Sequence, residues 1–209
     1  REIVYPVLTP MAVDASRPFP FLMNRTLNLA VELINNEGQH SRGFVQVPSV
    51  LPRIIEVERC SQRTFVFLEE VIIVHCQDLF KGCEILDIVP FRITRDSDLD
   101  VDEEDTENLL KEIEISLRKR KRGASVRLEI LKTRNQSIKK FLAGNLDLTE
   151  QAIYEISGPL DVTCFFKFIK LLNEPKWEFE PFVPQKPLEL AKMDNLFDRI
   201  REHDILLHH

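Results

Sequence analysis

CEILDIVPFRIT, residues 83–94, is the stretch that organises the rest of this chain. Its residues alternate as a strand does, and the run is long enough to cross a whole sheet. Beyond it, helical and strand patterns alternate in a regular order: helix 107–119, strand 125–131, helix 137–146, strand 152–157 and helix 161–172. This order predicts an α+β fold, a sheet of mixed or antiparallel strands with helices packed on one face.

The first 65 residues predict further strands, because they consist of short apolar runs separated by proline and by turn residues. The runs are IVYPVL (3–8), LNLAVELI (27–34), GFVQVP (43–48), RIIEVE (53–58) and TFVFL (64–68). A helix follows over 68–80, in which the spacing predicts that His75 is packed rather than catalytic. We therefore expect a strand-rich part at 1–65, an α/β core at 66–172 and, because four prolines fall within 174–187, an extended arm at 173–209.

Composition excludes several classes of protein. The net charge of −6 argues against a general nucleic-acid binder, and no apolar run approaches the length of a membrane span. Four cysteines without CxxC spacing indicate free thiols in a reduced, cytoplasmic protein. The six glycines do not cluster, so the glycine-rich phosphate loops GxxxxGK[ST] and GxGxxG are absent. The chain begins at Arg1, from which we expect a piece of a longer protein.

The acidic run DSDLDVDEEDTE (96–107) has acids at the ligand positions of a calcium-binding helix–loop–helix. Such a loop needs glycine at its sixth position for a sharp turn, and Val101 stands there instead. The run is better explained as a strand exit followed by the acid-rich first turn of a helix. That helix ends in the basic pentad 118–122, and opposite charges at the two ends complement the helix dipole. The pentad also allows a second interpretation, a localisation signal or polyanion patch.

Arg92 and Arg95 stand at the end of the long strand, where a sheet presents side chains to a cleft. They are either ordinary surface residues or a pair that contacts a polyanion through the planar guanidinium group.

Seven segments spread over nearly the whole chain carry a family resemblance. They are VLTPMAVDASRPFPFLMNRTLNLAVEL (7–33), VPSVLPR (47–53), FVFLEEVI (65–72), PFRITRDSDLDVDEED (90–105), RKRGASVRLEI (120–130), ISGPLDVT (156–163) and IREHDILLHH (200–209). In this order they resemble the middle, or head, domain of bacterial polyphosphate kinase, the ATP-dependent and histidine-phosphorylated type.

The resemblance implies a phosphotransferase that polymerises the terminal phosphate of ATP into polyphosphate, with ATP and magnesium bound in other domains of a longer, phosphorylated chain. No catalytic motif of the family has a match here, so we expect no catalytic, cofactor or metal-binding residue in these 209 residues and no activity of the chain alone. The implied partners are the catalytic domains of the same chain, a second subunit in a homodimer, and polyphosphate. The implied location is the cytoplasm, with membrane association possible for the parent enzyme. For contacts with the polyphosphate channel or a subunit interface we name Arg92, Arg95 and Arg127.

Two other functions are compatible with the residues alone. One is a hydrolase that uses the carboxylate pair Asp96 and Asp98, although no nucleophile or polarised histidine is placed beside it. The other is a stand-alone protein-interaction module that uses the proline-rich arm around Trp177.

Overall fold

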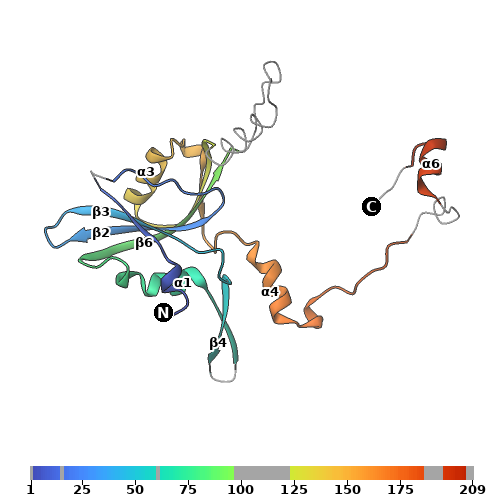
Figure 1. Ribbon diagram of the computed structural model, residues 1–209, viewed down its shortest axis with the longest axis horizontal. Helices are drawn as coiled ribbons and strands as arrows, with labels where there is room; N and C mark the ends of the chain where they lie inside the picture. The colour runs from blue at the N-terminus through green and yellow to red at the C-terminus, as the bar shows by residue number, and fades with distance from the viewer. Residues whose placement is uncertain (1, 15–16, 60–61, 97–122, 186–194, 206–209) are drawn as a thin grey trace, which may run out of the picture. The chain divides into compact units, whose positions relative to one another are not determined.

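The computed structural model describes residues 2–14, 17–59, 62–96, 123–185 and 195–205, and it divides into two compact units, residues 1–168 and residues 169–209. Unit 1 is built on a six-stranded sheet with the strand order β1-β3-β2-β6-β7-β8 (Figure 1). The strands are β1 (Pro10–Val13), β2 (Leu27–Asn35), β3 (His40–Gln46), β6 (Cys83–Arg95), β7 (Ser125–Leu131) and β8 (Ile153–Ile156).

β6 holds the sheet together because it pairs along both edges, with β2 on one side and β7 on the other. All neighbouring strands are antiparallel except β7 and β8, which run parallel. The mixed sheet and the α+β class are therefore as the sequence predicts, and β6 covers the predicted strand 83–94 with one further residue, Arg95.

Two helices cover the sheet, one on each face (Figure 1). Helix α1 (Leu68–Val74) packs on the face that carries Leu29 and Val31 of β2, whereas α3 (Gln136–Asn145) packs on the face that carries Ala30. The prediction of helices on one face only is thus wrong. The physical reason lies in β2, whose residues 27–31 are all buried and so need cover on both sides.

The start of α3 is fixed locally by Asn135. Its side-chain oxygen accepts hydrogen bonds from the backbone N–H groups of Ser137 and Ile138, at 3.1 and 3.2 Å. These are two of the amide groups that a helix leaves unpaired at its first turn, and capping them contributes about 1 kcal/mol.

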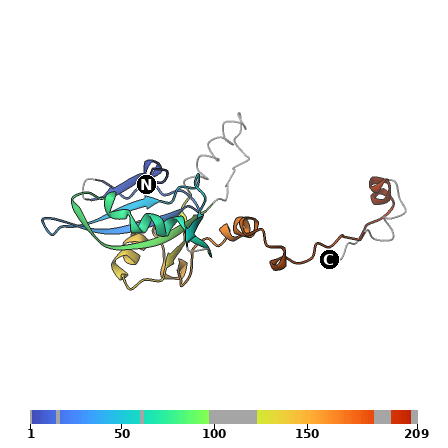
Figure 2. The same cartoon turned by 90° about the horizontal axis from the view of Figure 1, so that it is seen from below.

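Strands β4 (Ile54–Arg59) and β5 (Gln62–Phe67) form a separate two-stranded hairpin that stands away from the main sheet (Figures 1 and 2). Aromatic side chains cover one of its faces. Phe65 meets Phe168 with ring centres 4.9 Å apart, and Phe67 meets Phe165 at 6.2 Å, both edge to face. Phe165 and Phe168 belong to helix α4 (Cys164–Leu172), so α4 supports a hairpin that would be marginal by itself.

Short elements complete the described chain. The predicted strand at 3–8 is instead a 3-10 turn, η1 (Tyr5–Val7), because Pro6 fixes a helical φ and offers no N–H to a ladder. The other elements are η2 (Cys76–Asp78), η4 (Glu150–Ala152), η5 (Pro175–Trp177) and α6 (Leu196–Glu202). The predicted helix at 107–119 lies outside the described residues.

Candidate functional site

Arg92 is the first predicted site residue, and it lies on the α1 side of the sheet. Its neighbours Phe91 and Ile93 point into the opposite core, as alternation along β6 requires. Its Nη1 atom lies 3.5 Å from Glu129 Oε2, on the facing strand, and 3.5 Å from Asp161 Oδ1. Its Nε donates to the carbonyl oxygen of Arg25 at 3.1 Å. Arg92 therefore joins three parts of the chain.

Arg127 lies beside it and shares the same carboxylate. It stands two residues before Glu129 on β7, hence on the same face of the strand, and its Nη2 atom lies 2.9 Å from Glu129 Oε1. Its guanidinium carbon lies 4.0 Å from the centre of the Tyr154 ring, a cation–π contact. The side chain is 42% exposed, so Arg127 forms the solvent-facing end of the group.

Asp161 connects these residues to Arg53. Its backbone has φ of 49°, a left-handed conformation that is uncommon for a residue with a side chain. Arg53 Nη1 donates to the Asp161 carbonyl at 2.6 Å, and Arg53 Nη2 donates to the carbonyl of Leu160. Thr163 Oγ1 donates to Asp161 Oδ1 at 2.7 Å. These bonds hold the turn that leads into α4.

Glu69 of α1 completes the group at its buried end. Arg53 Nε donates to both of its carboxylate oxygens at 3.1 Å, and Arg53 Nη2 to Oε1 at 2.6 Å. Burial lowers the pKa of Arg53, but the hydrogen bond to Glu69 and the nearby Asp161 outweigh that effect, so its pKa is raised overall. Because the Glu69 side chain is only 6% exposed, Arg53 supplies the opposite charge and the hydrogen bonds that this buried carboxylate needs.

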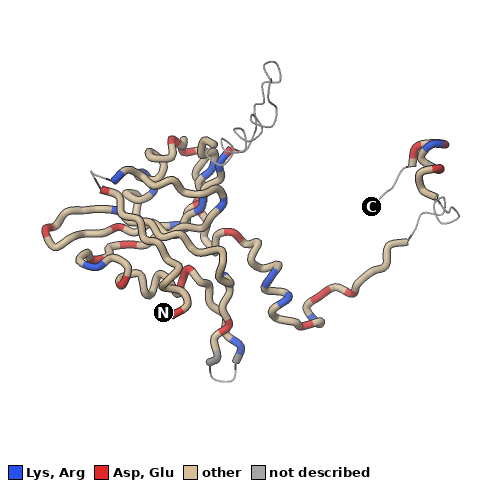
Figure 3. The backbone as a smooth tube through the Cα atoms, in the orientation of Figure 1, with Lys and Arg blue, Asp and Glu red and all other residues tan. Residues whose placement is uncertain are grey.

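These residues form a continuous row of alternating charge, which we call the arginine–carboxylate network: Glu69, Arg53, Asp161, Arg92, Glu129 and Arg127. Figure 3 shows basic and acidic residues close together where β6 ends and β7 begins. Three positive and three negative groups balance, so the network carries no formal net charge. It can bind segments together, and its exposed end presents guanidinium N–H donors of the kind that pair with phosphate oxygens.

Arg95 is not part of the network. A register shift between Thr94 and Arg95 interrupts the pairing of β6 with β7. The Arg95 guanidinium donates to the carbonyl oxygens of Leu22 and Gly123, each at 3.0 Å, and lies 4.5 Å from the Phe21 ring centre. Burial lowers the pKa of Arg95. Its role in the structure is to tie the segment before β2 to the chain that enters β7.

Gly123 explains why the chain can pass so close at that point. A Cβ atom on Gly123 would collide with the backbone carbonyl oxygen of Asp96, so no other residue fits at this position. The backbone N–H of Asp96 donates to the carbonyl of Ala124 at 2.8 Å. Glycine is therefore needed at this position for the close approach of the two backbone segments.

The remaining predictions about sites divide in two. His75 is exposed at the C-terminal end of α1, so the prediction that it is packed is wrong. The acidic run after Asp96 and the basic pentad 118–122 lie outside the described residues. Asp98 belongs to that run, so the structure tests neither the carboxylate pair Asp96 and Asp98 nor the calcium-loop interpretation. Within the described part of the chain, no group of three or more His, Cys, Asp or Glu side chains is arranged to hold a metal ion, and no helix is long and apolar enough to cross a membrane.

Sequence reasoning missed Arg53, Glu69, Glu129 and Asp161. The signal was present, because every residue of the network falls inside one of the segments that carry the family resemblance, and so does Arg25. Six of those seven segments, from different parts of unit 1, therefore meet at this one place.

Comparison with known proteins gives a consistent result. The family model described as the polyphosphate kinase middle domain matches residues 1–168. The chain is 42% identical to a polyphosphate kinase of Bacillus anthracis and 36% identical to one of Pseudomonas aeruginosa, and each match covers 100% of this chain and 31% of the relative. The chain thus spans about a third of the length of these curated relatives. A crystal structure of polyphosphate kinase from Porphyromonas gingivalis matches 96% of the chain, and 28% of that protein, with a TM-score of 0.63 at 21% identity, a likeness of fold.

Proposed function

This chain belongs to the polyphosphate kinase family, and from that premise we propose that it serves as a non-catalytic middle domain within a larger cytoplasmic phosphotransferase. The parent enzyme would transfer the terminal phosphate of ATP reversibly to a growing polyphosphate chain. ATP and magnesium would bind in its other domains, where a phosphorylated histidine would carry the phosphate. In such transfers positioning and charge neutralisation supply most of the acceleration.

The observation that carries this proposal is the arginine–carboxylate network. Its arginines are engaged with carboxylates and backbone carbonyls, and together they fasten six family-typical segments into one domain. The Thr163 hydroxyl does donate to the Asp161 carboxylate, but that carboxylate is already paired with Arg53 and Arg92, and the contact holds the turn that leads into α4. An architectural role fits this arrangement better than a chemical one.

Polyphosphate contact is the finer part of the proposal, and Arg127 is its first candidate. Arg127 is the most exposed arginine of the network, and its stacking on Tyr154 orients the guanidinium without occupying all of its donors. Arg92 is the second, because its pairs with Glu129 and Asp161 are long, at 3.5 Å, and a phosphate oxygen could compete for them. Arg95 is a weaker candidate for polyphosphate, since its guanidinium already donates to two carbonyl oxygens, and it stays a prediction for a contact at a subunit interface.

Support of a homodimer is the other finer part of the proposal, and a stand-alone interaction module is the second candidate function. One observation favours both of them. Trp177 and Phe179 in the arm after α4 are exposed, Phe179 completely, and large exposed aromatic groups mark interaction sites. If the arm is an interface, replacing Trp177 with alanine should change the gel-filtration profile of the chain.

A chimera tests the function. The matching segment of the Bacillus anthracis polyphosphate kinase is replaced by this chain, and ATP-dependent polyphosphate synthesis is measured. We expect the chimera to synthesise polyphosphate. In the chimera, R127A should weaken the use of polyphosphate as a primer, whereas the matched change R63A, in the hairpin, should not. A chimera that folds, by circular dichroism, but makes no polyphosphate would contradict the proposal.

A further inference from the structure

The carboxylate of Glu129 lies between two arginines. Its Oε1 atom is 2.9 Å from Arg127 Nη2, and its Oε2 atom is 3.5 Å from Arg92 Nη1. Alternation along β7 places Arg127 and Glu129 on one face, and the register of β6 with β7 sets Arg92 opposite Glu129. One carboxylate therefore bridges two guanidinium groups, which is the way a phosphate group is held between two arginines.

This single carboxylate does not satisfy both arginines. The Nε atom of Arg127 is buried, and within the described chain it has no hydrogen-bond partner, an arrangement that is costly for an N–H group. Arg92 Nη1 is shared between Glu129 and Asp161 at 3.5 Å each, close to the outer limit of a hydrogen bond. A phosphate group has more oxygens than a carboxylate, so it can accept from more of these N–H groups at once.

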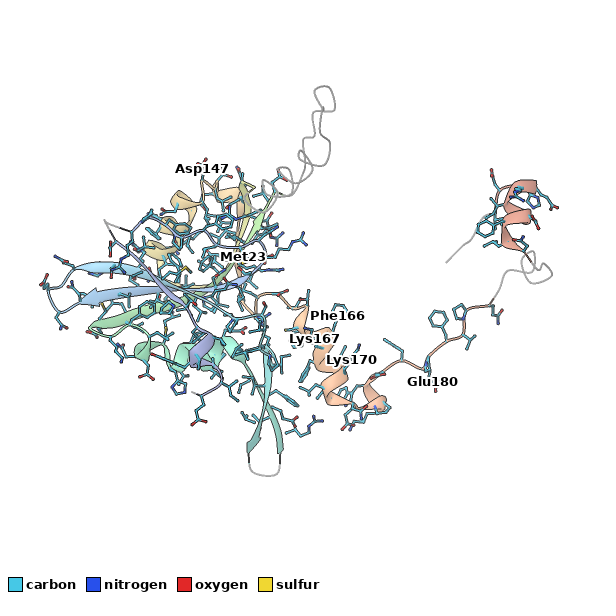
Figure 4. The ribbon with its side chains drawn as sticks, in the orientation of Figure 1. Met23, Asp147, Phe166, Lys167, Lys170 and Glu180 are labelled. Atoms are coloured by element: carbon cyan, nitrogen blue, oxygen red, sulfur yellow. The ribbon has the colours of Figure 1, made fainter. Side chains whose placement is uncertain are left out.

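The backbone around Arg92 is strained at two places. Arg92 Nε donates to the carbonyl oxygen of Arg25, whose φ is 58°, and Arg92 Nη1 faces Asp161, whose φ is 49°. Figure 4 labels Met23 at this end of the sheet, two residues before Arg25. Left-handed residues other than glycine cost conformational energy, and they cluster at ligand clamps and switch regions. Two of them on one arginine are typical of a ligand site.

From these observations we infer that Glu129 occupies the place of a phosphate group, and that a phosphate chain binds Arg92 and Arg127 by displacing the Glu129 carboxylate. The inference rests on the proposed function, because it names what keeps the same two arginines closed until their ligand arrives. The ligand class is an inorganic phosphate chain. Each unit of such a chain carries negative charge, and successive units can engage both arginines, whereas Glu129 brings one charge only.

The exposure of the side chains gives the order of contact. Arg127 is 42% exposed, whereas Arg92 and Glu129 are 19% and 18% exposed, so a ligand from solvent meets Arg127 first. Because Glu129 is itself partly exposed, its carboxylate can turn toward water when it is displaced. The two arginines then offer their positive charge to the chain instead of to Glu129.

Neutralising Glu129 should therefore strengthen phosphate binding. Isothermal titration calorimetry of the 209-residue chain with tripolyphosphate measures this. E129Q keeps the shape of the side chain but holds both arginines less strongly, so its affinity should exceed that of the wild type by at least roughly tenfold. The gain should disappear in E129Q/R92A and in E129Q/R127A. E129D keeps the charge but bridges less well because it is one methylene shorter, so it should show a smaller gain.

E84Q is the matched control, because Glu84 is an exposed acid on the same long strand. It lies about 26 Å along β6 from Arg92, at roughly 3.3 Å per residue. That separation exceeds the Debye length of about 8 Å at physiological salt, so E84Q should bind tripolyphosphate like the wild type.

Three results would overturn the inference. The first is an E129Q chain that binds tripolyphosphate no more tightly than the wild type. The second is an equal gain in E84Q, which would mean that net charge alone decides the affinity. The third is a gain in E129Q that survives the loss of Arg92 and Arg127. Circular dichroism checks that each variant is folded. No readout depends on phosphate transfer, so a failure here leaves the chimera test of the proposed function intact.

Discussion

Replacing Arg53 with alanine should destabilise unit 1 more than any other single change in the network. The substitution leaves Glu69, 6% exposed, without its cation, and it removes the donors to the carbonyls of Leu160 and Asp161. Breaking a buried ion pair by deleting one partner costs about 3–5 kcal/mol. For a chain of this size, that corresponds to a loss of roughly 6–20 °C in Tm.

The assay is urea unfolding followed by far-ultraviolet circular dichroism. Tryptophan fluorescence would not suffice, because the single tryptophan, Trp177, lies in residues 169–209 and not in unit 1. Two further variants give the result its meaning. R53K keeps the charge but not the planar fork, so it should fall between the wild type and R53A. The double variant R53M/E69L removes both charges, so it should lose less stability than R53A.

R63A is the matched control, because Arg63 pairs with Glu56 at 2.6 Å on the exposed hairpin. Water can replace that pairing, so the loss should be much smaller than for R53A. Two results would refute the reasoning that Arg53 balances a buried carboxylate. One is a loss of less than about 1 kcal/mol in the free energy of unfolding of R53A. The other is a loss for R53M/E69L that equals the sum of the losses for R53M and E69L measured separately.

Three further predictions concern packing and titration in unit 1. G43A should lower the free energy of unfolding by about 1–3 kcal/mol, because its Cβ would stand 2.5 Å from the Phe80 ring. G144A, with open space around it in α3, should raise the free energy of unfolding by about 0.5–1 kcal/mol, and thermal melts of the two variants check both expectations. F168A should cost about 1–3 kcal/mol by loosening the hairpin, and F166A, on the outer face of the same helix, should leave the stability of the monomer unchanged in urea unfolding at low protein concentration. Burial raises the pKa of the Cys76 thiol to about 11 from 9.0. As the pH rises, the unfolded chain therefore loses the thiol proton before the folded chain does, and the free energy of unfolding should fall by about 2–3 kcal/mol between pH 9 and 11. Unfolding curves across that range, compared with those of C76A, test this expectation.

Much of the fold was predictable because each element is encoded locally. The strand at Ser125–Leu131 follows a simple alternation, and the helix at Gln136–Asn145 is marked by its Asn135 cap and its apolar spacing. Which face α1 would cover was not predictable in the same way. That choice depends on how β2 pairs with β3 and β6, and pairing between distant strands leaves no local pattern.

The candidate site shows the same limit. Arg92 could be named from the sequence because it stands near the end of the long strand, and Arg127 because it falls in a segment that carries the family resemblance. Their shared partner Glu129 and the bridging role of Asp161 depend on strand register and on a left-handed turn 34 residues away from Arg127 in the sequence. Arg95 looked equivalent to Arg92, but one register shift at Thr94 sends it to backbone carbonyls instead.

The central claim is that these residues form an architectural domain whose chemistry belongs to other parts of a polyphosphate kinase. The most direct test incubates the isolated 209-residue chain with ATP, magnesium and a polyphosphate primer, and follows radiolabelled γ-phosphate into polymer and protein, with the chimera as the positive control. We predict label in polyphosphate for the chimera, and none in polymer or protein for the isolated chain. Turnover or stable phosphorylation by the isolated chain would contradict the claim.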